Sequence, residues 1–418
     1  MKFPQYSKFL SNFAWQSILL IAGRVSAMGM SFAISMIIAR SLGGSEYGRY
    51  IFLISIVNWV GLVFTFGLDS VPKMLAAVQE PDHQKKLLGG FFAFTGCMSL
   101  LLTLVLWICS IFVDSIFHIS IKMTLLWVAP LAGANLFQVL IEWACFGLKK
   151  TNILSGILFI SRLLNLLVVI FFIQQRITSA APYYFGFLLS TGIFPIVGWI
   201  TLQPDFSELK QSLREIQIDL KIFGKDAYIG RVPSNLAYNI DRLLLGYFST
   251  SKQVGFYGLS QSLVNPVVFV GGAVSQVAYR DFSSAKEISR KMMLTTIIVS
   301  LLASAATCVF GVLCIIFFLP LEYRGVLPLL FIMSLSALFQ SLYAPFNSFL
   351  GSKGKGRMLR NLGWTYTVSS LVLYFVSIPL WGVTGAAYAS GVINLIWLLQ
   401  CIWMYLKVKN PTEVTNAP

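Results

Sequence analysis

The chain has few charged residues for its length. Asp, Glu, Lys and Arg make up 11% of its 418 residues, whereas 57% are hydrophobic and the mean hydropathy is +0.77. A water-soluble globular protein needs more polar surface than this composition supplies. We therefore predict an all-α membrane protein whose chain crosses the bilayer several times.

Histidine and paired cysteine are scarce as well. The two histidines, His83 and His118, stand alone in loop regions. The cysteines lie inside apolar runs, without the spacing of metal ligands or of a disulfide framework. These absences exclude a zinc site and histidine-based chemistry, so we expect neither a metal nor a cofactor. The six cysteines are Cys97, Cys109, Cys145, Cys308, Cys314 and Cys401.

Acidic residues are outnumbered, with 16 against 31 basic ones and a net charge of +15. The basic excess is spread over predicted loops, which argues against nucleic acid as a partner. The first apolar run is too long for the core of a cleavable signal peptide, and no small-residue cleavage pattern follows it. We expect it to remain as a membrane helix.

The chain does contain a repeated segment. Positions 21–63 match positions 228–270 without a gap at an offset of 207, with ten identities. The identities include Gly23-Arg24-Val25, which recurs as Gly230-Arg231-Val232. The offset is close to half the chain length, which is typical of a duplicated membrane protein.

Long apolar runs predict about twelve membrane-spanning helices, because roughly 20 apolar residues are needed to cross the bilayer. Six crossings in each half give two six-helix lobes related by parallel duplication, with the transport path expected between them. The expected domains are an N-terminal lobe (1–201), a cytoplasmic linker helix (202–225) and a C-terminal lobe (226–418). The predicted spans are 14–39, 48–68, 88–113, 123–146, 152–173, 181–201, 226–247, 253–279, 292–318, 325–350, 357–380 and 384–405.

Basic residues are distributed unequally between the two predicted sides of the membrane. Seven lie on one side, three lie within spans, and the remaining 21 of the 31 lie on the other side. Because basic loops stay in the cytoplasm, both termini are predicted to be cytoplasmic. The seven are Arg40, Arg49, Lys122, Arg176, Arg242, Lys252 and Arg324.

One connection is long and polar. From Asp205 to Phe223, apolar residues recur every three or four positions, which predicts an amphipathic helix. Asp205 and Glu208 are placed like a capping box at its start. We expect this helix on the cytoplasmic surface, either as a plain linker or with its apolar stripe in the membrane interface.

Two arginines lie inside predicted spans at equivalent positions of the repeat. Arg24 is about 15 Å from the cytoplasmic end of its span by helical rise, and the gapless repeat gives Arg231 the same depth. An arginine within the bilayer costs about 2.5 kcal/mol or more, so it should face protein or water. A fixed charge with a fork of donors suits a phosphate group, which makes both residues candidate substrate ligands. The alternative for each is a buried ion pair that holds the helices together.

Further charged residues lie within or at the ends of spans. Glu142 and Arg162 have similar depths on either side of a cytoplasmic turn, which favours an ion pair; the alternative is Arg162 as a third substrate-binding arginine. Asp241, inside the seventh span, either carries a coupling proton or sodium ion or pairs with a base such as Arg242. Glu142 and Asp69, at the end of the second span, are further candidate ion carriers.

Short motifs follow one another in a fixed order along the chain: Ala39-Arg40-Ser41-Leu42-Gly43, Glu46-Tyr47-Gly48, Gly67, Ile240-Asp241-Arg242, Leu245-Gly246 and Val254-Gly255-Phe256-Tyr257. With them, the whole chain resembles the O-antigen and capsular polysaccharide flippases of the multidrug/oligosaccharidyl-lipid/polysaccharide exporter superfamily. The resemblance implies two six-helix lobes and a cationic cavity in a protein of the bacterial inner membrane. It also implies that an undecaprenyl-diphosphate-linked oligosaccharide is moved to the periplasmic leaflet by alternating access, with polysaccharide polymerase machinery as a further partner. Related drug exporters often carry a carboxylate in the first helix, where this chain has only Arg24.

Two other functions remain as alternatives. A cation-coupled exporter of drugs or metabolites would have an acidic rather than a basic lining. A membrane polysaccharide polymerase should carry a large polar periplasmic loop, whereas the longest polar connection here is the predicted cytoplasmic one. We therefore expect a transporter and not an enzyme.

Overall fold

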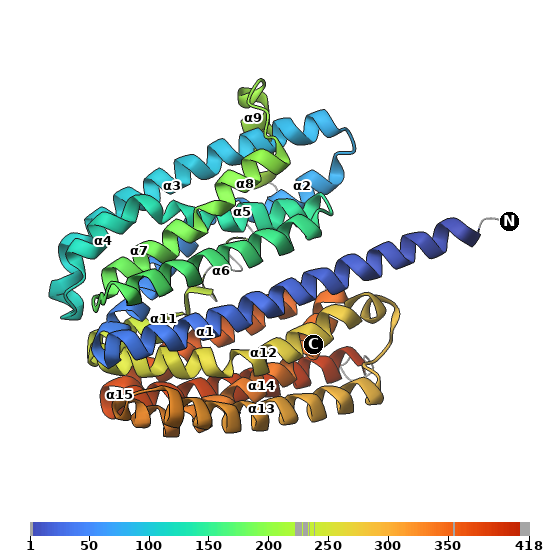
Figure 1. The fold of residues 1–418 in the computed structure, drawn as a ribbon. Coiled ribbons are helices and arrows are strands. Elements are labelled where there is room, and N and C mark those ends of the chain that lie inside the picture. The colour runs from blue at the N-terminus through green and yellow to red at the C-terminus, as the bar shows by residue number, and fades with distance from the viewer. Residues whose placement is uncertain are drawn as a thin grey trace, which may run out of the picture. The chain divides into compact units, whose positions relative to one another are not determined.

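The computed structural model describes residues 3–221, 228, 233, 235–237, 239–353 and 356–409. Within these ranges, the side chains of residues 3–22, 24, 276–281, 283–284 and 356–357 are not described. Every regular element in the described ranges is a helix (Figure 1), so the all-α prediction is confirmed. The chain divides into two compact units, which are described separately.

The N-terminal unit comprises Met1–Ser41 and Leu53–Val232. The short 3-10 turn η2 interrupts the predicted fourth span at Pro130, where a proline cannot donate the helical hydrogen bond. The helices that lie wholly or mainly in this unit are α1 (Phe3–Val63), η1 (Leu68–Ser70), α2 (Val71–Ala77), α3 (Pro81–Phe117), α4 (Lys122–Val128), η2 (Ala129–Leu131), α5 (Gly133–Gly147), α6 (Thr151–Gln174), α7 (Ala180–Thr191), α8 (Ile193–Leu202) and α9 (Leu209–Asp219).

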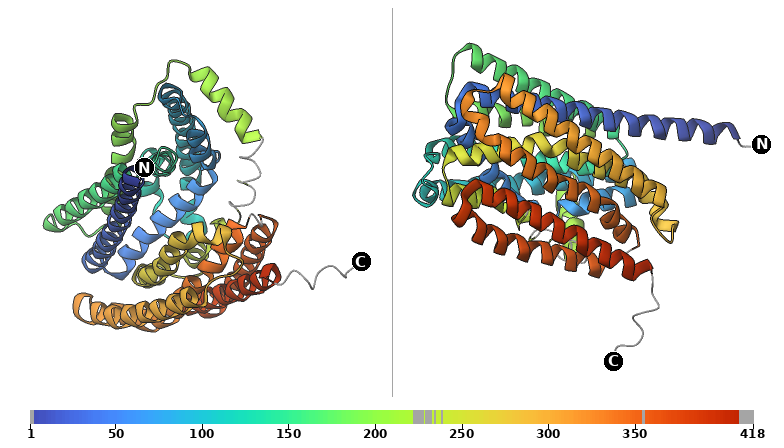
Figure 2. Two further views of the ribbon diagram at one scale, coloured as in Figure 1. Left: turned by 90° about the vertical axis from the view of Figure 1, so that its right-hand side faces the viewer. Right: turned by 90° about the horizontal axis from the view of Figure 1, so that it is seen from below.

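The C-terminal unit comprises Leu42–Phe52, which belongs to α1, and Pro233–Pro418. Helices α12, α13, α14 and α15 pack side by side in it (Figures 1 and 2). Its helices are α11 (Ile240–Phe248), α12 (Ser251–Ser284), α13 (Arg290–Phe318), η4 (Leu321–Gly325), α14 (Val326–Ser352) and α15 (Gly356–Lys409).

Eight helices in the described ranges are long and apolar enough to span a membrane. Two of them, α1 and α15, contain a glycine with positive φ, Gly43 (φ 71°) and Gly382 (φ 58°), a conformation that L side chains rarely adopt. In α15, the chain folds back at Gly382. The segments before and after this glycine lie side by side, since Gln400 Nε2 donates a hydrogen bond to Thr365 Oγ1 at 2.9 Å. Ten of the twelve predicted spans match these eight helices and one more coincides with α12. Of the span 226–247, the C-terminal part is α11, and several residues before it are outside the described residues.

The two copies of the repeated segment meet at equivalent positions within the C-terminal unit. A Cβ on Gly48 would lie 1.7 Å from the carbonyl oxygen of Ser251, and one on Gly255 would lie 2.9 Å from that of Gly44. These pairs are reciprocal, because an offset of 207 relates residue 44 to 251 and residue 48 to 255. This local symmetry supports the duplication inferred from the sequence, and it explains why both copies keep a glycine there.

Within the predicted linker 202–225, the structure has helix α9, and two residues of its apolar stripe face the protein. Ile216 and Leu220 are buried, and Ile216 packs against Gly90 of α3. Leu220 lies close to Gly67, as does Phe94 of α3. This end of the stripe is therefore covered by the protein itself, because the small residues Gly90 and Gly67 leave room for it.

The predicted capping box is wrong. Helix α9 begins at Leu209, and Glu208 at its N-cap makes no side-chain cap hydrogen bond. The Asp205 carboxylate instead accepts hydrogen bonds from the backbone N–H and the hydroxyl of Ser207, both at 2.9 Å. These bonds lower the pKa of the Asp205 carboxyl, and they occupy it in a local turn before the helix starts.

Candidate functional site

Asp241 is a buried carboxylate in the first turn of α11, with 3% of its surface exposed. Its Oδ2 accepts a hydrogen bond of 2.7 Å from the hydroxyl of Tyr257 on α12, and its Oδ1 accepts one of 2.8 Å from the backbone N–H of Arg242. The Tyr257 hydroxyl is also hydrogen-bonded to Tyr374 of α15. The carboxylate is thus the end of a short polar chain that joins three helices.

The guanidinium group of Arg242 is directed to a different partner. Its Nε and Nη2 donate to Oε1 of Gln261 on α12, at 3.1 and 2.5 Å. Arg242 therefore contacts Asp241 through its backbone, while its described side-chain hydrogen bonds go to an amide. The geometry therefore shows no direct ion pair between the side chains of Arg242 and Asp241.

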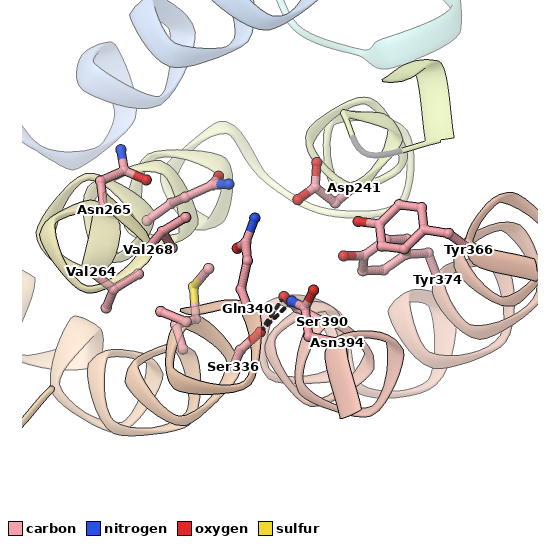
Figure 3. A pocket seen from close by; sticks show the side chains of 13 residues that line it. Asp241, Val264, Asn265, Val268, Ser336, Gln340, Tyr366, Tyr374, Ser390 and Asn394 are labelled. Atoms are coloured by element: carbon pink, nitrogen blue, oxygen red, sulfur yellow. Dashed lines mark hydrogen bonds between the residues drawn. The ribbon is translucent and has the colours of Figure 1, made fainter. Parts of the chain in front are cut away.

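Beside Asp241 lies a small polar cavity within the C-terminal unit, with a volume of about 20 Å³ and an opening to solvent, which is room for about one water molecule. Figure 3 shows Asp241 and Gln340 pointing into the same space. Asp241 is the one charged side chain among the described residues that line it, and amides, hydroxyls and small apolar groups form the rest. The lining residues are Asp241, Gln261, Val264, Asn265, Val268, Met333, Ser336, Ala337, Gln340, Tyr366, Tyr374, Ser390 and Asn394.

One wall of the cavity is a cluster of hydroxyl and amide groups. Ser336 on α14 shares a hydrogen bond of 2.8 Å with Ser390, and Asn394 Nδ2 donates to Ser336 Oγ at 2.9 Å. Asn394 is 5% exposed, and its Oδ1 is buried without a hydrogen-bond partner among the described residues. A buried carbonyl oxygen of this kind is costly unless a water or a ligand completes it.

Sequence reasoning identified Asp241 but missed the rest of this site. The missed residues follow a simple rule, because three helices each contribute two polar side chains four positions apart. One turn of helix separates the members of each pair, so both point to the same side. Polar pairs at this spacing inside apolar spans would have indicated the cavity. The pairs are Gln261 and Asn265, Ser336 and Gln340, and Ser390 and Asn394.

The described candidates Arg162, Glu142 and Asp69 lie outside the cavity lining. Arg24 lies in α1, but its side chain is outside the described residues, as is Arg231 altogether. In the N-terminal unit, the guanidinium carbon of Arg162 on α6 lies 5.4 Å from the centre of the Phe187 ring, a cation–π distance. Glu142 on α5 accepts a hydrogen bond of 2.9 Å from Gln138. The ion pair between Glu142 and Arg162 stays a prediction.

Asp69 lies in the turn η1, between the end of α1 and the start of α2, and is partly buried. It belongs to the N-terminal unit, as Glu142 does, and η1 packs against α5, which carries Glu142. Among the described residues, no group of three or more His, Cys, Asp or Glu side chains could hold a metal ion. Of the three candidate ion carriers, Asp241 is therefore the one that lines the polar cavity.

A family model described as polysaccharide biosynthesis protein matches residues 37–321, which is more than half of the chain. The chain belongs to this family. The resemblance stated from the sequence motifs is thereby confirmed at the level of the family. No curated protein sequence matches the chain.

Solved structures of similar fold are membrane transporters. The lipid II flippase MurJ, in an inward closed conformation, has a TM-score of 0.75 and 13% identity, over 94% of this chain and 90% of that one. An inward-facing multidrug resistance MATE family transporter of the MOP superfamily has a TM-score of 0.70 and 12% identity, over 92% and 96%. A mutant of the Vibrio cholerae MATE transporter VcmN has a TM-score of 0.60 and 16% identity, over 97% and 98%. At such identities these likenesses show the fold, which is that of a multi-pass membrane transporter with two helical lobes.

Proposed function

We propose that the protein translocates an undecaprenyl-diphosphate-linked oligosaccharide from the cytoplasmic to the periplasmic leaflet of the bacterial inner membrane by alternating access. The observation that carries the proposal is the family match over residues 37–321, in a chain with the fold of flippases and exporters. The role is transport of a finished lipid-linked unit for O-antigen or capsule synthesis, and the protein's own residues need no catalytic chemistry. Its partners are then membrane lipids, the lipid-linked substrate and the polymerase that receives it.

Arg24, Arg231 and Arg162 are the proposed contacts for the substrate diphosphate. The repeat gives Arg24 and Arg231 equivalent positions, and a guanidinium group binds phosphate oxygens through paired donors. Arg162 adds a third cation on α6, where its guanidinium group lies over the Phe187 ring. An anionic substrate explains why these spans carry arginine despite its cost in the membrane.

Asp241 is the proposed carrier of the coupling proton or sodium ion. Its carboxylate faces a cavity lined by amide and hydroxyl oxygens, which are the ligands that a hard cation prefers. The hydrogen bond from Tyr257 fixes one carboxylate oxygen, so an arriving ion meets a group already in position. Asp69 and Glu142 are secondary candidates for the same role.

A second function is favoured by one specific observation. The cavity beside Asp241 contains a carboxylate and no basic residue among its described lining, and MATE exporters share the fold. A cation-coupled exporter of drugs or metabolites therefore remains the alternative. The two functions differ in substrate charge, which the experiment below separates.

The decisive experiment uses the purified protein in proteoliposomes with an undecaprenyl-diphosphate-linked oligosaccharide in one leaflet. The amount that becomes accessible to an external glycosidase is measured over time. Wild-type protein should transfer the lipid, Arg24→Lys should retain part of the activity and Arg24→Ala should lose most of it. In a deletion strain, lipid-linked intermediates should accumulate until the wild-type gene is restored.

Failure of the wild-type protein to move this lipid, together with efflux of organic cations, would establish the exporter instead. Normal transfer by Arg24→Ala at normal membrane abundance would exclude Arg24 from the diphosphate site. Reporter fusions test the orientation separately: fusions at Ser179 and Thr250 should report periplasmic positions, and those at Lys86 and Lys353 cytoplasmic ones.

A further inference from the structure

Helix α9 and its flanking residues separate their charges by sign. All three acidic residues between 208 and 221 contact the body of the N-terminal unit. Glu208 forms an ion pair with Lys86 and Asp219 with Lys73, each at 2.7 Å, and Glu215 is hydrogen-bonded to His83 at 3.0 Å. The acidic side chains of the helix are therefore directed to α2 and α3.

The basic residues of α9 and of the turn that follows it, which includes Lys221, point the other way. Lys210, Arg214 and Lys221 are exposed, and at about 100° per residue they fall within roughly 40° of the helix circumference. Ser212, which is buried against Gly90, lies on the opposite side. Gln217 and the half-exposed Ile218 border the basic residues. We call Lys210, Arg214 and Lys221 the basic face of α9.

The contacts of α9 set its depth relative to the membrane. They begin at His83 and Lys86 of α3 and extend to Gly90 and the vicinity of Phe94, a rise of about 12 Å from Lys86 to Phe94. The predicted third span begins at residue 88, so this stretch of α3 crosses from polar surroundings into the bilayer. We therefore expect α9 at the level of the lipid head groups.

Aromatic residues mark the same level. Trp199, near the end of α8, is 54% exposed, and its ring stacks on Phe206 at 5.1 Å, just before α9 begins (Figure 2 shows α9 following α8). Exposed tryptophans concentrate where the hydrocarbon meets the head groups. The segment leading into α9 is thus anchored at the membrane boundary by a contact independent of the charges.

We propose that the basic face of α9 binds the anionic phospholipid head groups of the adjoining leaflet. Three cations on one stripe at head-group depth are complementary to a negatively charged lipid surface, to which each exposed base adds attraction. The neighbouring Ile218 suits the boundary with the acyl chains, whereas the exposed face offers no aromatic ring among its described residues on which a nucleic acid base would stack. This surface is independent of the transport proposal, because it uses none of the residues assigned to the substrate or the ion.

The test compares two triple variants of the full-length protein. Lys210→Gln, Arg214→Gln and Lys221→Gln remove the basic face. The matched control, Lys286→Gln, Arg290→Gln and Lys291→Gln, removes the same charge from exposed positions of the C-terminal unit. Binding is measured by native mass spectrometry and by the melting temperature during titration with phosphatidylglycerol or phosphatidylcholine.

The wild-type protein and the control should be stabilised by phosphatidylglycerol and much less by phosphatidylcholine. The basic-face variant should bind phosphatidylglycerol roughly ten- to a hundredfold more weakly, while it melts without lipid as the wild-type does. Unchanged phosphatidylglycerol binding by that variant, or equal loss in the control, would overturn the proposal. Stronger stabilisation by added RNA than by phosphatidylglycerol would overturn it as well. Should the triple variant fold poorly, Lys210→Arg with Lys221→Arg must keep the lipid preference and Lys210→Gln with Lys221→Gln must lose most of it; any other result counts against the proposal.

Discussion

The two copies of the repeat differ at the position that matters most in the candidate site. The residue equivalent to Asp241 at an offset of 207 is Ile34, and both are about 3% exposed. The tyrosine that binds Asp241 is kept in both copies, as Tyr50 and Tyr257. One fold position is thus filled by an isoleucine in one half and by a carboxylate in the other. The fold does not require a charge there, so the carboxylate in the second copy is best explained by function.

A second comparison concerns where each unit keeps its charged and polar groups. In the N-terminal unit, the ion pairs of α9 lie at the boundary of the unit, where the charged groups retain contact with water. In the C-terminal unit, a carboxylate and several amides line a cavity among the helices. Polar groups placed among helices are costly and mark functional sites in membrane proteins, which directs attention to the second copy.

The largest loss of stability is expected from substitutions at the two glycines where the copies of the repeat meet. Gly48→Ala should destabilise the protein by about 3 kcal/mol or more, because its Cβ would lie 1.7 Å from a backbone oxygen and the helices must shift. Gly255→Ala, with its nearest atom at 2.9 Å, should cost less. Thermal melting of the purified protein measures both. Gly61→Ala and Gly272→Ala, which meet nothing within 4 Å, serve as controls, and equal melting of Gly48→Ala and Gly61→Ala would contradict the close contact.

Replacing Asp241 by the residue of the first copy tests the functional difference. Asp241→Ile should abolish the response of transport to the proton or sodium gradient. It should also cost roughly 1–3 kcal/mol of stability, because the Tyr257 hydroxyl loses its carboxylate acceptor. Asp241→Asn, which keeps an acceptor, should lose the gradient response with a smaller loss of stability.

The double variant Asp241→Ile with Tyr257→Phe provides the control for that experiment. It removes both partners of the hydrogen bond, so it should recover part of the stability without recovering the gradient response. A folded Asp241→Asn protein that still responds fully to the gradient would show that another residue carries the ion.

The polar cluster opposite Asp241 should have a moderate effect. Asn394→Ala removes the hydrogen bond to Ser336 and the buried Oδ1, so we expect a stability change of about 1 kcal/mol in either direction and a weaker apparent affinity for the coupling ion. Ion-dependent melting shifts measure the affinity. Gln84→Ala in the N-terminal unit, whose amide bonds only backbone carbonyls, is the matched amide control. If both variants show the same ion-dependent melting shift, the cluster takes no part in ion binding.

The smallest effect is expected at the apolar counterpart. Ile34→Val removes one buried methylene and should cost about 0.5–1.5 kcal/mol while leaving the gradient response unchanged. Melting temperature and transport are measured on the same preparation. Loss of the gradient response in Ile34→Val would mean that the two copies act together in coupling, against the distinction drawn here.

Much of the fold could be predicted from the sequence because the bilayer imposes a simple rule on composition. An apolar run long enough to span must be helical, since its backbone groups have no other partners, and eleven of the twelve predicted spans coincide with described helices. Of the site, only Asp241 was predicted, because a lone charge in an apolar run is conspicuous. The neutral residues around it were missed, since a serine or an amide within a helix has no distinctive meaning until its neighbours on other helices are known.

The sequence by itself determined the helical class, the duplication, the family and the unusual position of Asp241. These follow from local features, namely hydropathy, spacing and identity at a fixed offset. Tertiary structure alone decided that Tyr257 and not the Arg242 side chain binds Asp241, that pairs of polar side chains from α12, α14 and α15 share its cavity, and that α9 turns its acidic residues inward. Each of these depends on contacts between segments distant in the chain, whose geometry is set by how helices pack and not by the order of residues within any one of them.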